Sequence, residues 1–144
     1  MAESLTIDED TPFGARVARH LREGVAVWLT TVAPSGTPTP NPVWFQWDGA
    51  DRVRVHSLPD AARVRHLATN PRVALHFDDD GSGSRVVVLT GTARPAPELP
   101  AADADPAYLA RYAEHITRIG HTPASFAAQY SLPVEVTLTG LRGY

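Results

Sequence analysis

The sequence predicts a mainly β fold with peripheral helices, arranged as an antiparallel barrel. Short segments of alternating apolar and polar residues recur along the chain, and turn-forming residues such as Asp48-Gly49 separate them. A few amphipathic helical segments lie between these strands, without the regular strand–helix alternation of a parallel sheet. Strands joined in hairpins, with helices at the periphery, are typical of an antiparallel barrel.

Length and composition limit the possible functions. The 144 residues suit one domain with a real core, so we expect residues 1–144 to form a single domain. A net charge of -3 argues against nucleic acid as a partner, and the absence of cysteine excludes disulfides and thiol chemistry. The acidic, polar N-terminus is unlike a signal peptide, and no apolar run reaches membrane-spanning length. We therefore expect a cytoplasmic protein without membrane contact.

A helix and a strand open the chain. Thr11-Pro12 resembles an N-cap followed by proline at the first helical position. Apolar residues then recur at helical spacing, at Phe13, Val17 and Leu21, and Gly24 is a suitable stop. Residues 25–32 follow as the first strand, which a turn at 34–36 closes.

The second strand, predicted near 39–47, has an unusual start. Alternate positions are proline: Pro38, Pro40 and Pro42. One edge of the strand therefore lacks amide donors, because residues two apart point their amides to the same edge. The donors of the opposite edge belong to Thr39, Asn41 and Val43. Such one-sided donors suit contact with a planar ligand, and they also suit a plain edge strand protected against aggregation.

Aromatic residues cluster farther along the same strand. Alternation places Trp44 on one face, and Phe45 with Trp47 on the other. We expect one face to belong to the core. The other face is able to flank a ring system.

A strand at 52–57 leads into a helix at about 61–69, for which Asp60 is the expected N-cap. Ser57 ends the strand and Arg63 lies in the first helical turn. First-turn amides and the helix dipole favour an anion there, and a guanidinium binds phosphate with two parallel hydrogen bonds. The alternative is a solvent-facing arginine beside a strand-terminal serine.

The rest of the chain is predicted to contain three strands and two helices. The strands are residues 73–77, 85–94 and 133–140, and the helices are residues 106–119 and 123–130. The polar sequence at 78–84 predicts a hairpin loop. Gly91 lies inside a strand, which indicates a bulge or a close approach of two backbones.

Motifs of several catalytic and metal-binding classes are missing from the sequence. The histidines do not follow a metal-binding spacing, so we expect no metal site. The residue types of a Ser-His-Asp triad are present, but Gly81-Ser82-Gly83-Ser84 is a polar loop rather than a nucleophile elbow. Glycine-rich phosphate loops of the Rossmann or Walker type do not occur.

From about Val25 to Tyr144, the sequence resembles the pyridoxamine 5′-phosphate oxidase-like, FMN-binding split β-barrel superfamily. Within it, the sequence is most similar to the actinobacterial branch of F420-dependent oxidoreductases. The segments that carry the resemblance are Asn41-Pro42-Val43-Trp44-Phe45, Val55-His56-Ser57, Ala61-Ala62-Arg63-Val64-Arg65, Asn70-Pro71-Arg72-Val73-Ala74-Leu75, Gly91-Thr92-Ala93 and Pro133–Tyr144.

This resemblance implies a homodimer with a flavin held at the subunit interface. It places Arg63 where a basic residue binds the cofactor phosphate, and Ser57 at a strand-end hydroxyl position. The cofactor-binding positions that it implies are Asn41, Pro42, Val43, Trp44, His56, Ser57, Ala61 and Arg63. The oxidase itself has basic residues where this chain has Asn41, Gln46 and Ala62, so pyridoxamine phosphate oxidation is not the expected reaction.

The expected activity is hydride transfer between coenzyme F420 and a small unsaturated or quinone-like acceptor, with no catalytic side chain assigned. An FMN-binding reductase of the same fold is the nearest alternative. A non-enzymatic carrier of a flavin or tetrapyrrole is another. The last is a dimeric barrel without a ligand.

Overall fold

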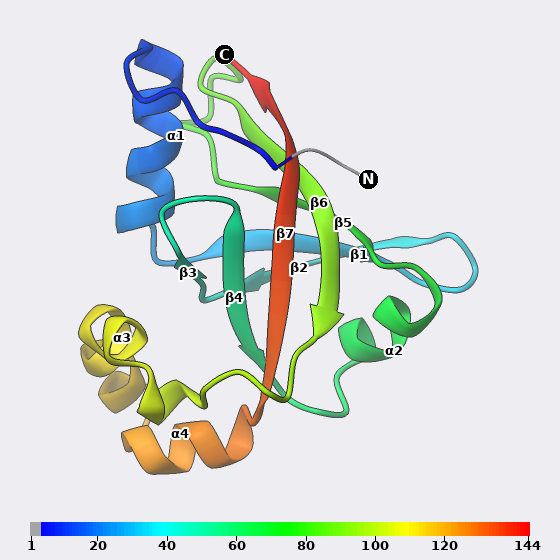
Figure 1. Cartoon of the computed structure of the whole chain (residues 1–144), viewed down its shortest axis with the longest axis vertical. Helices are drawn as coiled ribbons and strands as arrows, with labels where there is room; N and C mark the ends of the chain where they lie inside the picture. Colours follow the sequence, from blue (N-terminus) through cyan, green and yellow to red (C-terminus); the bar gives the residue numbers. More distant parts are fainter. Residues whose placement is uncertain (1–3) are drawn as a thin grey trace.

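The computed structural model describes residues 4–144, which form a curled, antiparallel, seven-stranded sheet with four α-helices around it (Figure 1). The strands are β1 (Val27–Val32), β2 (Pro38–Val43), β3 (Gln46–Trp47), β4 (Arg52–Ser57), β5 (Arg72–His76), β6 (Val87–Pro95) and β7 (Leu132–Gly143). The helices are α1 (Pro12–Glu23), α2 (Ala62–Thr69), α3 (Pro106–Arg118) and α4 (Pro123–Gln129), with a short 3₁₀ turn at Ala102–Ala104. The predicted split-barrel fold is confirmed.

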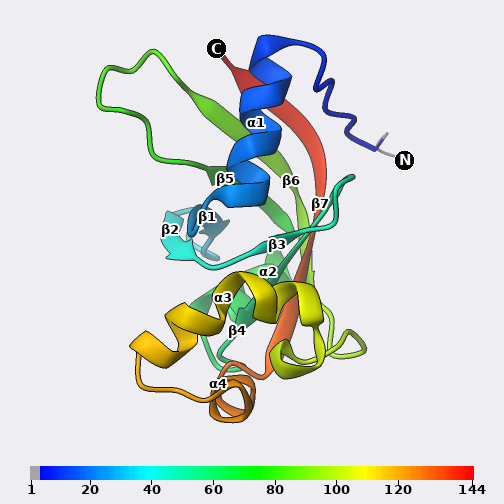
Figure 2. The same ribbon diagram turned by 90° about the vertical axis from the view of Figure 1, so that its left-hand side faces the viewer.

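The sheet order is β2-β1-β5-β6-β7-β4-β3, so the two edge strands are consecutive in the chain. Helix α1 lies near one end of the curled sheet, while α3 and α4 lie together at the other (Figure 2). The helix that the sequence predicts from Thr11 is confirmed, because the Thr11 hydroxyl accepts a hydrogen bond of 2.9 Å from the Gly14 amide. Within residues 4–144, no helix has the length and apolar character needed to cross a membrane.

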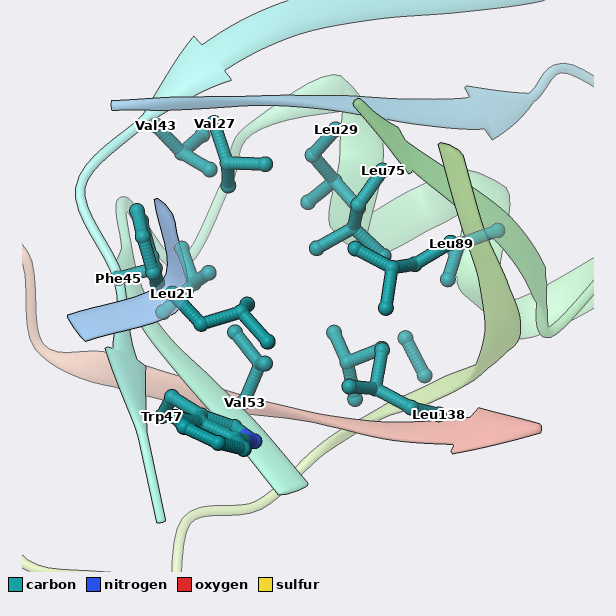
Figure 3. Close-up of a cluster of buried hydrophobic side chains, with 14 of the residues drawn as sticks. Leu21, Val27, Leu29, Val43, Phe45, Trp47, Val53, Leu75, Leu89 and Leu138 are labelled. Carbon is teal, nitrogen blue, oxygen red and sulfur yellow. The ribbon is translucent and has the colours of Figure 1, made fainter. Parts of the chain in front are cut away.

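Two separate hydrophobic clusters stabilise the molecule. The first fills the sheet interior, where Leu21, Val53 and Leu138 are completely buried and project toward one another (Figure 3). The second lies within the helical layer, where α3 and α4 contribute Tyr108, Tyr112, Ile116 and Phe126. The helical layer therefore has its own packed core, and polar and aromatic side chains join it to the strands.

The predicted second strand is interrupted. Residues 38–43 form β2 and pair with β1, whereas β3 pairs with β4 on the far edge of the sheet. At the interruption, the Phe45 amide donates to the hydroxyl of Tyr112 at 2.9 Å. A side chain from α3 thus replaces a strand partner, so the prediction of one strand over 39–47 was wrong.

The amides of β2 do not face a ligand. Because Pro38, Pro40 and Pro42 cannot donate, the ladder of β2 with β1 must use the amides of the intervening residues. The expectation that the donors of Thr39, Asn41 and Val43 contact a planar ligand is therefore wrong. The free edge of β2 offers carbonyl acceptors instead.

Gly91 marks a β-bulge, as predicted, since the β6–β7 register shifts between Thr90 and Gly91. A Cβ atom on Gly91 would lie 2.0 Å from the carbonyl oxygen of Thr137. Gly91→Ala is therefore expected to lower the free energy of unfolding by about 1–3 kcal/mol, measured by urea denaturation. Thr92→Ala, at an exposed position on the same strand, is the control and should leave the urea midpoint nearly unchanged. Equal midpoints for the two variants would contradict this account of Gly91.

Candidate functional site

A cavity of about 190 Å³ opens where β2 ends, beside α2 and the helical layer. Its walls are formed by Pro42, Val43, Trp44, His56, Arg63, Tyr108, Ile119, Phe126 and Tyr130. The structure thus brings most of the predicted cofactor-binding residues to one place. The exceptions are Asn41, Ser57 and Ala61, which lie outside the cavity wall.

Arg63 is the cation of this cavity. It projects from the first turn of α2, and its Nη1 donates a 3.0 Å hydrogen bond to the Ser57 hydroxyl. Ser57 is itself completely buried and donates to the Leu58 carbonyl at 2.9 Å. Ser57 therefore orients Arg63 from behind and does not face the cavity.

The Arg63 guanidinium has spare binding capacity. Partial burial lowers its pKa from the ordinary arginine value, and no carboxylate within residues 4–144 forms an ion pair with it. A desolvated cation without a counter-ion favours the arrival of an anion, and a planar guanidinium suits phosphate. This end of the cavity therefore has the chemistry of an anion site.

The start of α2 strengthens that site. The N-cap is Ala61, and no described side chain caps the helix, so the predicted cap by Asp60 was wrong. The Asp60 carbonyl instead accepts from the Arg65 guanidinium at 2.7 Å, and the Asp60 side chain is exposed. The first amides of α2, at Ala62 and Arg63, have no hydrogen-bond partner within residues 4–144. The positive end of the helix therefore remains free for an anion.

Trp44 forms an aromatic wall at the interruption between β2 and β3. Its indole stacks on Tyr112, with ring centroids 4.9 Å apart, and on Phe126 at 5.5 Å. The amide of Trp44 has no partner within the described chain. The predicted separation of faces is confirmed, because Phe45 and Trp47 belong to the barrel core and Trp44 packs against the helical layer.

His56 and Tyr108 form a neutral polar pair in another part of the cavity wall. His56 is only 6% exposed, and neither ring nitrogen finds a hydrogen-bond partner within residues 4–144. Burial, aided by the nearby Arg54 charge, lowers the pKa of His56 to about 4, so the imidazole is neutral near pH 7. Its ring packs edge-on against Tyr108 at 4.6 Å, and burial raises the pKa of that phenol. This wall offers uncharged hydrogen-bonding groups.

Several cavity residues were not predicted as site residues: Tyr108, Ile119, Phe126 and Tyr130. Their helical spacing indicated only helices with an apolar face. The spacing does not tell which strand the helices pack against, so the sequence pattern alone could not place them at the end of β2. Asn41 pairs with Leu29 before the end of β2, whereas the cavity wall begins at Pro42 and Val43.

Comparison with known proteins assigns this chain to a family. The profile of the family described as pyridoxamine 5′-phosphate oxidase matches residues 13–139. No curated protein sequence matches the chain.

Solved structures show the same fold. An F420 reductase is 25% identical, with a TM-score of 0.59 over 86% of this chain and 94% of that protein. A Clostridium acetobutylicum protein related to general stress protein 26, of the pyridoxinephosphate oxidase family, is 18% identical with a TM-score of 0.63 over 92% and 86% of the two chains. The heme storage protein HutZ from Vibrio cholerae is 15% identical with a TM-score of 0.60 over 92% and 95%.

The last two similarities concern the fold alone, since their sequence identities are low. The family profile, by contrast, covers the barrel strands, the Ser57–Arg63 junction and the helical layer together. The chain therefore belongs to the pyridoxamine 5′-phosphate oxidase family, whose members share this split-barrel fold and include flavin-related oxidoreductases.

Proposed function

We propose that this protein is an F420-dependent oxidoreductase, which transfers a hydride between the deazaflavin and a small unsaturated or quinone-like acceptor. The observation that carries the proposal is the Arg63 end of the cavity. There a half-buried guanidinium without a carboxylate partner lines the cavity, and it projects from the first turn of α2, which has no side-chain cap. The similarity to an F420 reductase supports the choice of cofactor.

A flavin phosphate fits the residues present. The Arg63 guanidinium, held by Ser57, would bind the phosphate oxygens, and the first amides of α2 would add uncharged donors. The volume of about 190 Å³ is below the roughly 300–1,000 Å³ of sites that enclose a whole ligand. The cavity of one chain therefore suits the phosphate-bearing end of the cofactor, with the ring extending outward along β2.

When bound, the deazaflavin supplies the hydride chemistry, and the protein supplies binding and orientation. The carbonyls on the free edge of β2 would accept hydrogen bonds from ring N–H groups, and the Trp44 amide would donate to a ring carbonyl. The apolar side chains of Trp44, Phe126 and Ile119 would exclude water from one side of the site. FMN shares the phosphate and the ring edge, so it is the competing cofactor.

A ring that extends beyond β2 needs a second covering surface, and we propose that another copy of this chain provides it. The outward face of four strands carries two rows of uncharged residues, Pro40–Thr30–Ala74–Thr90 and Pro42–Trp28–His76–Val88. The second row includes Pro42, which also lines the cavity. An uncharged, partly apolar face that continues into the site is suited to a homodimer.

Placing a charge on this face should separate the subunits. Thr30→Glu is expected to convert the dimer to a monomer in sedimentation velocity, because an unpaired carboxylate is costly to bury at an interface. The same variant should bind F420 at least about tenfold more weakly, since the ring loses its second cover. Thr117→Glu, at an exposed position of α3, is the matched control. A Thr30→Glu variant that remains dimeric would contradict the assignment of this face.

Binding isotherms of F420 and FMN on the purified protein test the function directly. We expect F420 to bind with a micromolar or lower dissociation constant, and the reduced cofactor to be oxidised when quinones or enones are added. Tight binding without turnover across such acceptors would indicate a carrier. Failure of both cofactors to bind at micromolar concentrations would refute the proposal.

A further inference from the structure

The charges around the cavity are few. Among residues 4–144, Arg63 is the only cavity-lining side chain that is charged near neutral pH. The other ionisable groups in the wall are His56, which burial keeps neutral, and the phenols of Tyr108 and Tyr130. Arg65, on the same helix as Arg63, is exposed and directs its guanidinium to the Asp60 carbonyl outside the cavity wall.

Tyr130 approaches Arg63 from a different element. It is the C-cap of α4 and stacks on Phe126 with ring centroids 4.6 Å apart. Its hydroxyl makes no hydrogen bond within residues 4–144, and the phenol lines the same cavity as Arg63. The anion end of the cavity thus combines one cation with one uncharged donor.

We infer that this Arg63–Tyr130 end selects a phosphodiester, which carries one negative charge, over a phosphomonoester, which carries nearly two. The inference rests on the proposed function and identifies the cofactor class that the site prefers. The phosphate of F420 is a diester, whereas that of FMN is a monoester with a second pKa near 6. One guanidinium neutralises the diester fully. A monoester dianion would retain an unpaired charge in a partly desolvated site, which is unfavourable.

The charge of FMN can be changed by pH, which provides the test. A monoester is about 90% monoanion at pH 5 and about 1% monoanion at pH 8. The affinity of the protein for FMN is therefore expected to fall between pH 5 and pH 8 by at least fivefold, with a ceiling of about ninetyfold if only the monoanion binds. The affinity for F420, whose diester does not titrate in this interval, should change much less.

Between pH 5 and pH 8, the ionisable side chains that line the cavity do not change charge. His121 lies behind this wall, edge-on to Phe126 and Tyr130, and is the titratable neighbour of the site. His56 has a pKa of about 4 and Arg63 remains protonated, while burial raises the pKa of Tyr108. Changes in the net charge of the whole protein act on both anionic cofactors. Riboflavin, which lacks the phosphate, reports any effect of pH on ring binding.

Variants of Tyr130 provide a second, independent measurement at pH 8. Tyr130→Phe keeps the stacked ring and removes the donor, so F420 should bind about three- to tenfold more weakly. Tyr130→Arg adds a second cation that is able to stack on Phe126 in place of the phenol. It should shift the ratio of FMN to F420 affinity by at least about tenfold in favour of FMN. Tyr144→Phe, at a tyrosine that is 67% exposed, is the control.

The outcomes separate this inference from the proposed function. A falling FMN affinity with a steady F420 affinity, reversed in preference by Tyr130→Arg, supports selection of the diester. If both cofactors bind through Arg63 but the FMN affinity is constant or rises toward pH 8, the inference is overturned and the flavin site remains. If neither cofactor binds, the proposed function fails and the inference with it.

Discussion

Replacing Arg63 by alanine is expected to weaken the binding of F420 about ten- to hundredfold. Hydrogen bonds to charged groups contribute about 1.5–3 kcal/mol each, and Arg63 is the cation that the cavity offers to a phosphate. The half-buried guanidinium has no carboxylate partner within residues 4–144, so its removal leaves no buried acid unpaired. The loss should therefore appear in cofactor binding rather than in stability.

Fluorescence titration of the wild type and the variants with F420 measures this loss. Arg65→Ala, two residues along the same helix and exposed, is the matched control and should bind normally. Arg63→Lys keeps the charge but cannot form two parallel hydrogen bonds, so an intermediate affinity is expected. Riboflavin should bind Arg63→Ala and the wild type equally. Equal F420 affinities for Arg63→Ala and Arg65→Ala would remove Arg63 from the site.

The position of Arg63 was predictable because local rules are sufficient to determine it. A strand that ends at Ser57, a short turn and a helix that stops before Asn70-Pro71 together place the arginine in the first helical turn. The barrel was predictable for a similar reason, since β1, β5 and β6 each alternate buried residues with more exposed ones. Both features depend on residues that are close together in the sequence.

The predictions that were wrong concern places where contacts with other segments override local preferences. Asp60 has a good capping side chain, but the turn after Leu58 makes Ala61 the N-cap, with the Ala61 amide donating to the Leu58 carbonyl at 3.2 Å. The absence of a carboxylate cap suits the proposed phosphate site, because a carboxylate there would repel a phosphate. The second strand was predicted as continuous because its interruption depends on Tyr112, which lies 67 residues away.

Separation along the sequence also explains why half of the candidate site was not predicted. Tyr108, Phe126 and Tyr130 reach the cavity only because α3 and α4 pack over the end of β2. Their spacing reports that each helix has an apolar face, and it does not report which strand that face covers. A local pattern was able to locate Arg63, the arginine proposed to bind a phosphate, whereas the residues around it required the tertiary structure.

Tyr112 connects the helical layer to the strands, and its removal should have the largest effect on stability. The side chain is completely buried, and its hydroxyl accepts from the Phe45 amide at 2.9 Å and donates to the Val25 carbonyl at 2.8 Å. Its ring lies parallel to Trp44 within 8°. Tyr112→Ala is therefore expected to lower the free energy of unfolding by about 3–5 kcal/mol. Tyr112→Phe should lower it by about 1–3 kcal/mol, because the Phe45 amide is left buried without a partner.

Urea denaturation of the phenylalanine variants distinguishes a specific bond from general packing. Tyr108→Phe is the matched control, because Tyr108 is equally buried in the same helix but its hydroxyl has no partner within residues 4–144. We expect Tyr108→Phe to be nearly neutral and Tyr112→Phe to be clearly destabilised. If the two variants are equally stable, the interruption at Phe45 does not depend on the Tyr112 hydroxyl. If only Tyr112→Phe also loses F420 affinity, the bond that interrupts the strand is the one that holds Trp44 at the cavity.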